Sequence, residues 1–159
     1  MENNHDRYFL QMAVDLAAEN VRSGRGGPFG AVIVKDGEVL ATGVNLVTTN
    51  NDPTAHAEVT AIRNATEKLK DFQLSGCTLY SSCEPCPMCL GAIYWARPER
   101  LVYATSKHDA ADAGFDDAFI YEEIELPIAQ RHLQTAYCPE EPFTLPFRLW
   151  KESAGKTEY

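Results

Sequence analysis

Apolar side chains recur at steps of three and four residues between residues 5 and 22, which is the spacing that places them on one face of an α-helix. A glycine-rich break over residues 23–28 then interrupts the pattern. We therefore expect the chain to open with an amphipathic helix. Its predicted buried stripe consists of Phe9, Met12, Ala13, Leu16, Ala17 and Val21.

Two strand-like segments follow the break, at residues 29–34 and 38–43. The Asp36-Gly37 pair between them is typical of the tight turn of a hairpin, because the turn needs a residue that tolerates positive φ. These segments predict an antiparallel hairpin. The polar stretch over residues 45–51 predicts a loop after it.

The middle of the chain alternates between helical and extended patterns. Asp52-Pro53 resembles a helix start, and an apolar stripe at helical spacing extends the predicted helix to about Lys70. Beyond this helix we predict a strand at residues 77–82, a helix at residues 88–97 that begins after Pro87, and a strand at residues 100–105.

The carboxy-terminal part carries weaker patterns. Residues 109–117 are acidic and rich in alanine, residues 117–125 predict a helix, residues 133–137 predict a last strand, and residues 153–159 have the composition of a loose end. The overall order of elements predicts an alternating α/β layout with right-handed crossovers. With 159 residues, 45% of them hydrophobic, we expect a single domain over residues 1–159 that buries about two-thirds of its unfolded surface.

The chain is acidic, since 23 Asp and Glu against 14 Lys and Arg give a net charge of −9. Such a field repels polyanions, so we expect neither nucleic acid nor a membrane as a partner.

The longest apolar runs, such as residues 31–34, are far too short to cross a bilayer, and the amino terminus does not resemble a secretory leader. An odd number of cysteines, 5, with three of them clustered, favours metal ligands and reduced thiols over a disulfide framework. We predict a soluble cytoplasmic protein.

Two short motifs carry candidate chemistry. His56-Ala57-Glu58 and Pro85-Cys86-Pro87-Met88-Cys89 each lie at the start of a predicted helix, so the two segments can meet. His56, Cys86 and Cys89 supply three zinc ligands, one fewer than a closed tetrahedral site uses. The fourth position is then left for water, which is typical of a catalytic rather than a structural metal.

Glu58 is the candidate proton carrier beside this metal. Two helical steps rotate the chain by about 200°, so His56 and Glu58 serve one site only if their helix points its amino-terminal end at the metal. Two such helix starts would also direct partial positive charge toward the thiolates. Zinc activates water near pH 7, and Glu58 would pass the water proton to a ring nitrogen and then to the departing amine, so that ammonia leaves and a carbonyl remains.

Each motif has a simpler explanation when it is taken alone. His-x-Glu is common by chance, and Cys86 with Cys89 could form a redox pair or, together with Cys83, part of a structural zinc site. Taken together the two motifs favour one open site, because their residue types, order and helix-start positions agree. Cys83 precedes the helix, and we expect it to pack or to line the loop rather than to bind the metal.

At these motifs the chain resembles the cytidine deaminase-like superfamily of zinc-dependent deaminases. Within that superfamily it is most similar to the bacterial guanine deaminases. The similarity is carried by GPFGAVIV at residues 27–34, NDPTAHAEV at 51–59 and CEPCPMCLGAIYWARP at 83–98, and it extends through AGFDD at 113–117 to the terminal Glu158-Tyr159.

The resemblance implies a three-layer α/β/α sandwich with a central five-stranded mixed sheet, one Zn²⁺ per subunit, and hydrolysis of guanine, a small purine base, to xanthine and ammonia. It also implies a homodimer in which the C-terminal segment, about residues 139–159, reaches the neighbouring subunit's active site. The substrate-binding residues that it implies are Phe29 and Trp95 on the purine faces, Asn45 and Asp117 on its polar edges, Ala57, and Tyr159 closing the pocket.

These pocket residues also have structural explanations. Phe29 and Trp95 fit core packing, Asn45 fits a turn, Asp117 fits a solvated acidic surface, and Tyr159 fits a frayed chain end.

Other functions share the zinc signature. A transfer-RNA adenosine deaminase has the same motifs, but an RNA-binding enzyme normally carries a basic stripe, and this chain is acidic. Guanosine and cytosine deaminases use the same chemistry on other substrates, and the size of the pocket would separate them. A non-enzymatic, zinc-stabilised module is disfavoured by Glu58, because a structural zinc site has no use for a carboxylate that is not a ligand.

Overall fold

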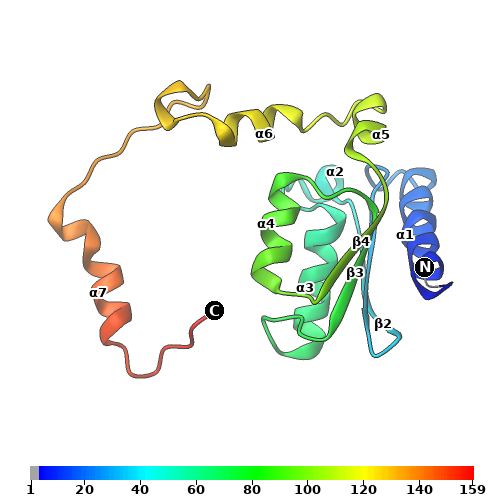
Figure 1. The fold of residues 1–159 in the computed structure, drawn as a ribbon, viewed down its shortest axis with the longest axis horizontal. Coiled ribbons are helices and arrows are strands. Elements are labelled where there is room, and N and C mark those ends of the chain that lie inside the picture. The colour runs from blue at the N-terminus through cyan, green and yellow to red at the C-terminus, as the bar shows by residue number, and fades with distance from the viewer. Residues whose placement is uncertain (1–3) are drawn as a thin grey trace. The chain divides into compact units, whose positions relative to one another are not determined.

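The computed structural model describes residues 4–159, which divide into two compact units (Figure 1). The first unit ends at Ala118, and the second comprises Phe119–Tyr159. All the strands found in the described residues belong to the first unit.

A mixed four-stranded sheet forms the centre of the first unit. The strands, in the spatial order β2-β1-β3-β4, are β1 (Gly30–Lys35), β2 (Glu38–Val44), β3 (Cys77–Cys83) and β4 (Arg100–Thr105). Strand β1 is antiparallel to both of its neighbours, β2 and β3, whereas β3 is parallel to β4. The hairpin turns at Asp36-Gly37, where both residues have positive φ, as the sequence predicted.

Helices cover both faces of this sheet (Figure 1). α1 (Asn4–Arg22) packs against β1, β3 and β4. α3 (Ala57–Leu69) packs against β2 and β1 on the other face, with α4 (Pro87–Ala96) beside it. The three-layer α/β/α sandwich expected from the sequence is therefore confirmed.

Successive residues of the strands belong to two separate apolar cores, one on each face of the sheet. Ile33 and Leu79 belong to the core that contains the buried side of α3, whereas Val32 and Tyr80 belong to the core that contains Phe9 of α1. This alternation follows from the two-residue period of a strand, which points successive side chains to opposite faces. The first unit thus has one apolar layer on each side of its sheet.

Two glycines determine how closely the helices approach the sheet. A Cβ at Gly43 of β2 would lie 2.3 Å from the carbonyl oxygen of Ala57 and 2.4 Å from the amide nitrogen of Ala61, both in the backbone of α3. A Cβ at Gly30 of β1 would lie 2.4 Å from the carbonyl oxygen of Ala13 in α1. Each helix therefore contacts the sheet at a position where only glycine fits.

A polar cluster ties α1 to β3 and β4. The Tyr80 hydroxyl donates to Asp6 at 2.8 Å, and the Arg100 guanidinium donates to both Asp6 oxygens at 2.8 and 2.6 Å. The bonds from Arg100, and then the one from Tyr80, hold the pKa of Asp6 below its ordinary value. Burial, together with the bond to Asp6, raises the pKa of Tyr80 to about 12. These bonds compensate for the loss of hydration at the buried carboxylate.

The segment before α3 differs from the prediction. A short helix, α2 (Val47–Asn50), lies within the stretch predicted as a loop. Asp52-Pro53 does not start α3, because a carboxylate oxygen of Asp52 accepts bonds from the amide and the hydroxyl of Thr54 at 2.8 and 2.7 Å and so closes a turn. The helix begins only at Ala57. Val21, which was expected in the buried stripe, is exposed near the end of α1.

The acidic stretch after β4 contains a helix that the sequence did not predict, α5 (Lys107–Asp112). Ser106 is its N-cap: the Ser106 hydroxyl accepts from the Asp109 amide, and the Asp109 carboxylate accepts from the Ser106 amide. This reciprocal pair is a capping box, which stabilises the start of a short helix.

The second unit consists of short helices and loops. α6 (Ala118–Glu125) confirms the helix predicted there. None of residues 119–159 is buried within the described structure. The remaining elements are η1 (Ile128–Gln130), η2 (Glu141–Thr144) and α7 (Leu145–Glu152).

No helix in residues 4–159 combines the length and the apolar character that a bilayer-spanning segment needs.

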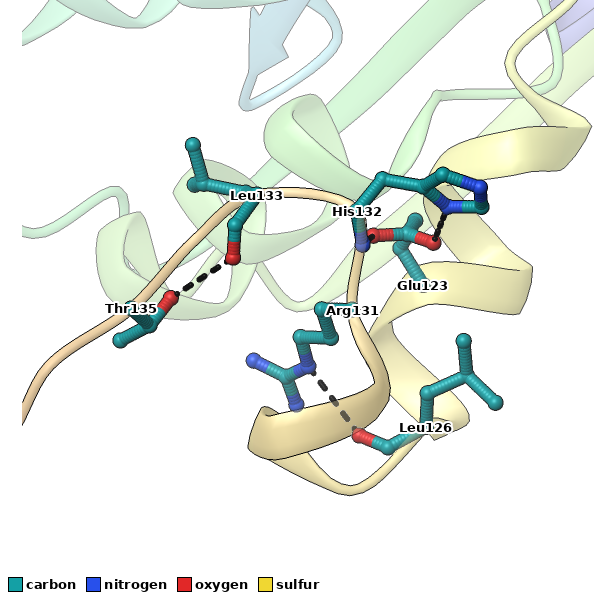
Figure 2. A network of polar contacts seen from close by, with 6 residues as sticks. All are labelled: Glu123, Leu126, Arg131, His132, Leu133 and Thr135. Atoms are coloured by element: carbon teal, nitrogen blue, oxygen red, sulfur yellow. Dashed lines mark hydrogen bonds and ion pairs between the residues drawn. The ribbon is translucent and has the colours of Figure 1, made fainter.

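The strand predicted at residues 133–137 is not found, so the sheet of the described residues has four strands instead of the expected five. Figure 2 shows a polar turn just before this segment, in which Glu123 accepts from the His132 amide at 2.9 Å and pairs with its Nδ1 at 2.7 Å. Leu133 and Tyr137 are 77% and 88% exposed. The strand prediction for these residues was wrong, since a strand needs a neighbouring edge to pair with and no such pairing is found in the described residues.

Candidate zinc centre

Three side chains that could bind a metal meet where two helices begin. His56 is the N-cap of α3, Cys86 is the N-cap of α4, and Cys89 follows in the first turn of α4. The Nδ1 atom of His56 lies 3.5 Å from the Sγ of Cys86 and 3.4 Å from the Sγ of Cys89. All three ligand atoms lie within 4.8 Å of one another. The structure thus brings the three predicted ligands together.

The spacing of these atoms fits a tetrahedral zinc ion. Zn–S and Zn–N bonds of about 2.3 and about 2.05 Å at a tetrahedral angle separate sulfur from nitrogen by about 3.6 Å. The observed separations are 3.5 and 3.4 Å. One imidazole and two thiolates are also donors that zinc prefers, and three protein ligands are the number typical of catalytic zinc sites.

The starts of α3 and α4 orient the ligands. The backbones of His56 and Cys86 are extended, and neither side chain bonds to the first-turn amides of its helix. Pro87 occupies the first turn of α4, where a missing amide hydrogen costs nothing. Both helices therefore direct the positive ends of their dipoles toward the ligand group, which favours the thiolate forms. This is the arrangement that the His-x-Glu spacing requires.

Glu58 lies beside the three ligands and is only 5% exposed. Its Oε2 is 3.3 Å from the Sγ of Cys89, and its Oε1 accepts a hydrogen bond from the Ser81 hydroxyl at 3.0 Å. Burial raises the pKa of Glu58, because the ionised carboxylate loses its hydration. A carboxyl group with a raised pKa takes up and releases protons closer to neutral pH, which suits general acid–base catalysis.

The ligands are electrostatically coupled. The hydrogen bond from Cys89, with a smaller contribution from His56, lowers the pKa of Cys86 to about 4. The same contact with Cys86 raises the pKa of Cys89, and a hydrogen bond with Cys86 raises the pKa of His56. The lowered pKa favours the thiolate form of Cys86, which is the form that binds a metal.

Cys83 is the last residue of β3 and is not part of the ligand group found in the described residues. Its buried thiol donates to the carbonyl oxygen of Ser106 at 3.4 Å. Burial raises the pKa of this thiol, so it keeps its proton. Cys83 packs under the segment that follows β4, as expected from the sequence.

Two of the residues predicted to bind substrate, Phe29 and Asn45, lie next to strands of the sheet and contact neighbouring residues. Phe29 is half-buried, and its ring stacks edge-on against Phe115 with centroids 5.0 Å apart. Asn45 is buried, and its Oδ1 accepts from the amides of Gly27 and Val47 at 3.4 and 3.3 Å. Asn45 therefore does close a turn, which was its structural explanation.

The other predicted pocket residues differ in exposure. Ala57 is fully buried between the two site residues of α3, and Asp117 is half-buried, which raises its pKa. Trp95 is 65% exposed on α4, so it is not a core residue. Tyr159 is exposed in the second unit, where its ring lies edge-on to Trp150 with centroids 6.5 Å apart.

Sequence reasoning missed two residues of this region, Ser81 and Phe115. Ser81 shares a strand face with Leu79, and a polar residue on the buried face of a central strand needs a partner, so the pattern contained a signal for it. Phe115 carries no comparable signal, because it lies in an irregular segment and meets Phe29 only through the fold.

The zinc ligands and strands lie within a segment that matches a known family. Residues 3–105 match the family described as the cytidine and deoxycytidylate deaminase zinc-binding region. The chain belongs to this deaminase family. The match covers more than half of the deaminase and contains all three ligands, and zinc is therefore its cofactor.

Relatives of this deaminase include a guanine deaminase and tRNA-specific adenosine deaminases. Guanine deaminase of Bacillus subtilis is 58% identical over 156 residues, which is 98% of this chain and 99% of that protein. Its crystal structure matches with a TM-score of 0.95 at 57% identity, covering 96% of this chain and 98% of that one. The tRNA-specific adenosine deaminase of Buchnera aphidicola is 39% identical over 139 residues, which is 87% of this chain and 91% of that protein. The similarity to the guanine deaminase is higher and extends further.

Proposed function

We propose that this zinc-dependent deaminase hydrolyses guanine to xanthine and ammonia. The observation that carries the proposal is the buried carboxylate of Glu58 beside three nitrogen and sulfur ligands for one zinc ion. The choice of guanine is supported by 58% identity to the Bacillus subtilis guanine deaminase over almost the whole chain. A net charge of −9 argues against a transfer-RNA substrate.

In the proposed reaction, water adds to the amidine-like carbon that bears the exocyclic amino group, and the bond from this carbon to the amino nitrogen then breaks. Bound zinc supplies the Lewis acidity that makes water a nucleophile near neutral pH. Glu58 accepts a proton from the water, donates a proton to the adjacent ring nitrogen, and later delivers one to the departing amine. The two hydrogens of the water end on the ring nitrogen and on ammonia, so the atoms balance.

The predicted pocket residues have roles consistent with their surroundings. Phe29 and the exposed ring of Trp95 would offer aromatic surfaces to the purine. Asn45 would donate from its side-chain NH₂ group, because its oxygen binds the loop amides. Asp117 would accept from the N–H groups of guanine, and Ala57 would line the pocket beside the carboxylate. These roles distinguish guanine, which has several donors along one edge, from adenine.

We further propose that residues 1–159 form one deaminase domain that works as a cytoplasmic homodimer. The C-terminal segment, about residues 139–159, would reach the neighbouring subunit, where Tyr159 would close the pocket. This is supported by the second unit, in which large apolar side chains stay exposed and would gain from burial in a partner. The cytoplasmic location is supported by five free cysteines. The apolar side chains concerned are Phe119, Ile124, Leu133, Phe143, Phe147 and Leu149.

The test is ammonia release from the zinc-loaded protein. Guanine, guanosine, adenine, cytosine and transfer RNA are supplied separately, and we expect rapid release from guanine with little from the others, because unpaired polar groups in a matched pocket penalise the wrong ring. Release from transfer RNA or adenine in preference to guanine would refute the substrate. No release from any of them would refute the enzymatic function.

A further inference from the structure

Ser81 occupies a rigid position in the middle of the sheet. It lies in β3, where it pairs with Ala31 of β1 on one side and with Tyr103 of β4 on the other. Its backbone is thus held by strands on both edges, and the residue is only 2% exposed. A side chain on this part of β3 has little freedom to move.

The Ser81 hydroxyl lies on the same strand face as Leu79, which belongs to the apolar core on the α3 side. A hydroxyl buried on such a face destabilises the fold unless it has a hydrogen-bond partner. Its partner is Oε1 of Glu58, at 3.0 Å. The buried hydroxyl of Ser81 thus has one oxygen of the Glu58 carboxylate as its hydrogen-bond partner.

The two oxygens of Glu58 have different surroundings. Oε1 is bound to the sheet through Ser81, whereas Oε2 lies 3.3 Å from the Sγ of Cys89 and so faces the metal ligands. A carboxylate on a side chain with three rotatable bonds would otherwise sample several orientations in the site. The hydrogen bond to Ser81 restricts it to the one in which Oε2 points at the ligand group.

We propose that Ser81 is a positioning residue for deamination: its hydroxyl holds Oε1 of Glu58 so that Oε2 is the oxygen that transfers the proton. The inference rests on the proposed function, since it assumes that Glu58 moves protons. A hydroxyl is suited to this task, because it can donate to Oε1 both when Glu58 is a carboxylate and when Oε2 carries the proton and Oε1 is the carbonyl oxygen. The contact therefore persists through both halves of the proton transfer.

Ser81→Ala tests the proposal, with Ser81→Thr as the conservative variant and Tyr80→Phe as the control. Tyr80→Phe also removes one buried hydroxyl from β3, but from the opposite face, where the hydroxyl donates to Asp6. In Ser81→Ala we expect kcat to fall about tenfold to a hundredfold, the range typical of a hydrogen bond to a charged group. We expect an unchanged KM, unchanged zinc content by elemental analysis, and a kcat in Ser81→Thr close to that of the wild type. In Tyr80→Phe we expect lower stability with an unchanged kcat.

A second measurement separates positioning from structure. If Ser81 acts through Glu58, then Ser81→Ala lowers kcat in the wild-type background but has no further effect on the residual kcat of Glu58→Gln. A crystal structure of zinc-loaded Ser81→Ala should also show Glu58 turned away from its wild-type orientation.

Several outcomes would overturn the inference. One is a wild-type kcat in Ser81→Ala. Another is an equal fall in kcat when Ser81→Ala is introduced into the wild type and into Glu58→Gln. The third is loss of zinc from Ser81→Ala. Failure of the proposed function gives a different result, since the wild-type protein itself would then release no ammonia from guanine.

Discussion

Gly43→Ala should damage the zinc site from a position outside it. The added Cβ would lie 2.3 Å from the carbonyl oxygen of Ala57 and 2.4 Å from the amide nitrogen of Ala61, whereas ordinary contact begins at 3.4 Å. Both contacts are with backbone atoms, which cannot rotate away. α3 must therefore move by about 1 Å relative to β2.

This displacement acts directly on His56 and Glu58, because they flank Ala57 at the start of α3. A shift of about 1 Å in a catalytic group can cost about a hundredfold in rate. Overpacking of this kind also destabilises a fold by about 1–3 kcal/mol. In Gly43→Ala we therefore expect a kcat about a hundredfold lower, weaker zinc binding in a chelator competition, and a matching loss in the free energy of unfolding by urea.

Gly30→Ala is the matched control. Its Cβ would lie 2.4 Å from the carbonyl oxygen of Ala13 and 2.9 Å from the amide nitrogen of Ala17, so it displaces α1 on the opposite face of the sheet. We expect a similar loss of stability with kcat and zinc affinity near those of the wild type. The reasoning fails if Gly43→Ala keeps wild-type kcat and zinc affinity, or if both variants lose activity equally.

Three further predictions concern the carboxylates and the tail. Glu58→Gln should keep the fold and the zinc, because an amide oxygen can still accept from Ser81, but kcat should fall at least about a thousandfold; full turnover would exclude proton transfer by Glu58. Asp6→Asn should lower the free energy of unfolding by about 2 kcal/mol, because it loses charge-assisted bonds to Arg100. The fold holds the pKa of Asp6 below its ordinary 3.8, so the difference in the free energy of unfolding between the wild type and Asp6→Asn should be constant above about pH 5 and should shrink as the pH falls below about 4. Urea titrations at each pH measure it, and a difference that persists to about pH 2 would contradict the prediction. Deleting Tyr159 should lower kcat/KM about tenfold without changing Tm, and unchanged steady-state kinetics would refute its role in closing the pocket.

The strands and the three longer helices of the first unit, α1, α3 and α4, could be predicted from the sequence because each has a clear local pattern. The stripe that contains Phe9 and Ala13 has helical spacing, Asp36-Gly37 determines the hairpin, and Pro87 starts α4. The metal ligands could also be predicted, because zinc limits the residue types and their number so strictly. In these places local chemistry and the final fold agree.

Other features depend on contacts that no short segment contains. Asp52-Pro53 has the composition of a helix start, but the Asp52 carboxylate binds Thr54 and closes a turn instead. Residues 133–137 were predicted as a strand, yet strand formation also requires an adjacent edge, which no short segment specifies. The role of Ser81 depends on Glu58, 23 positions earlier in the chain, which comes within reach only after α3 packs on the sheet.

The placement of Cys83 decides what kind of chemistry the ion can perform. A fourth sulfur would complete the tetrahedron and turn a reactive ion into an inert structural one. Cys83 lies outside the ligand group found in the described residues: its thiol donates to the carbonyl oxygen of Ser106, and burial raises its pKa, so the sulfur keeps its proton. Since Ser106 also caps α5, the residue that begins this helix is the one whose carbonyl oxygen receives the Cys83 thiol, away from the ligands at the starts of α3 and α4.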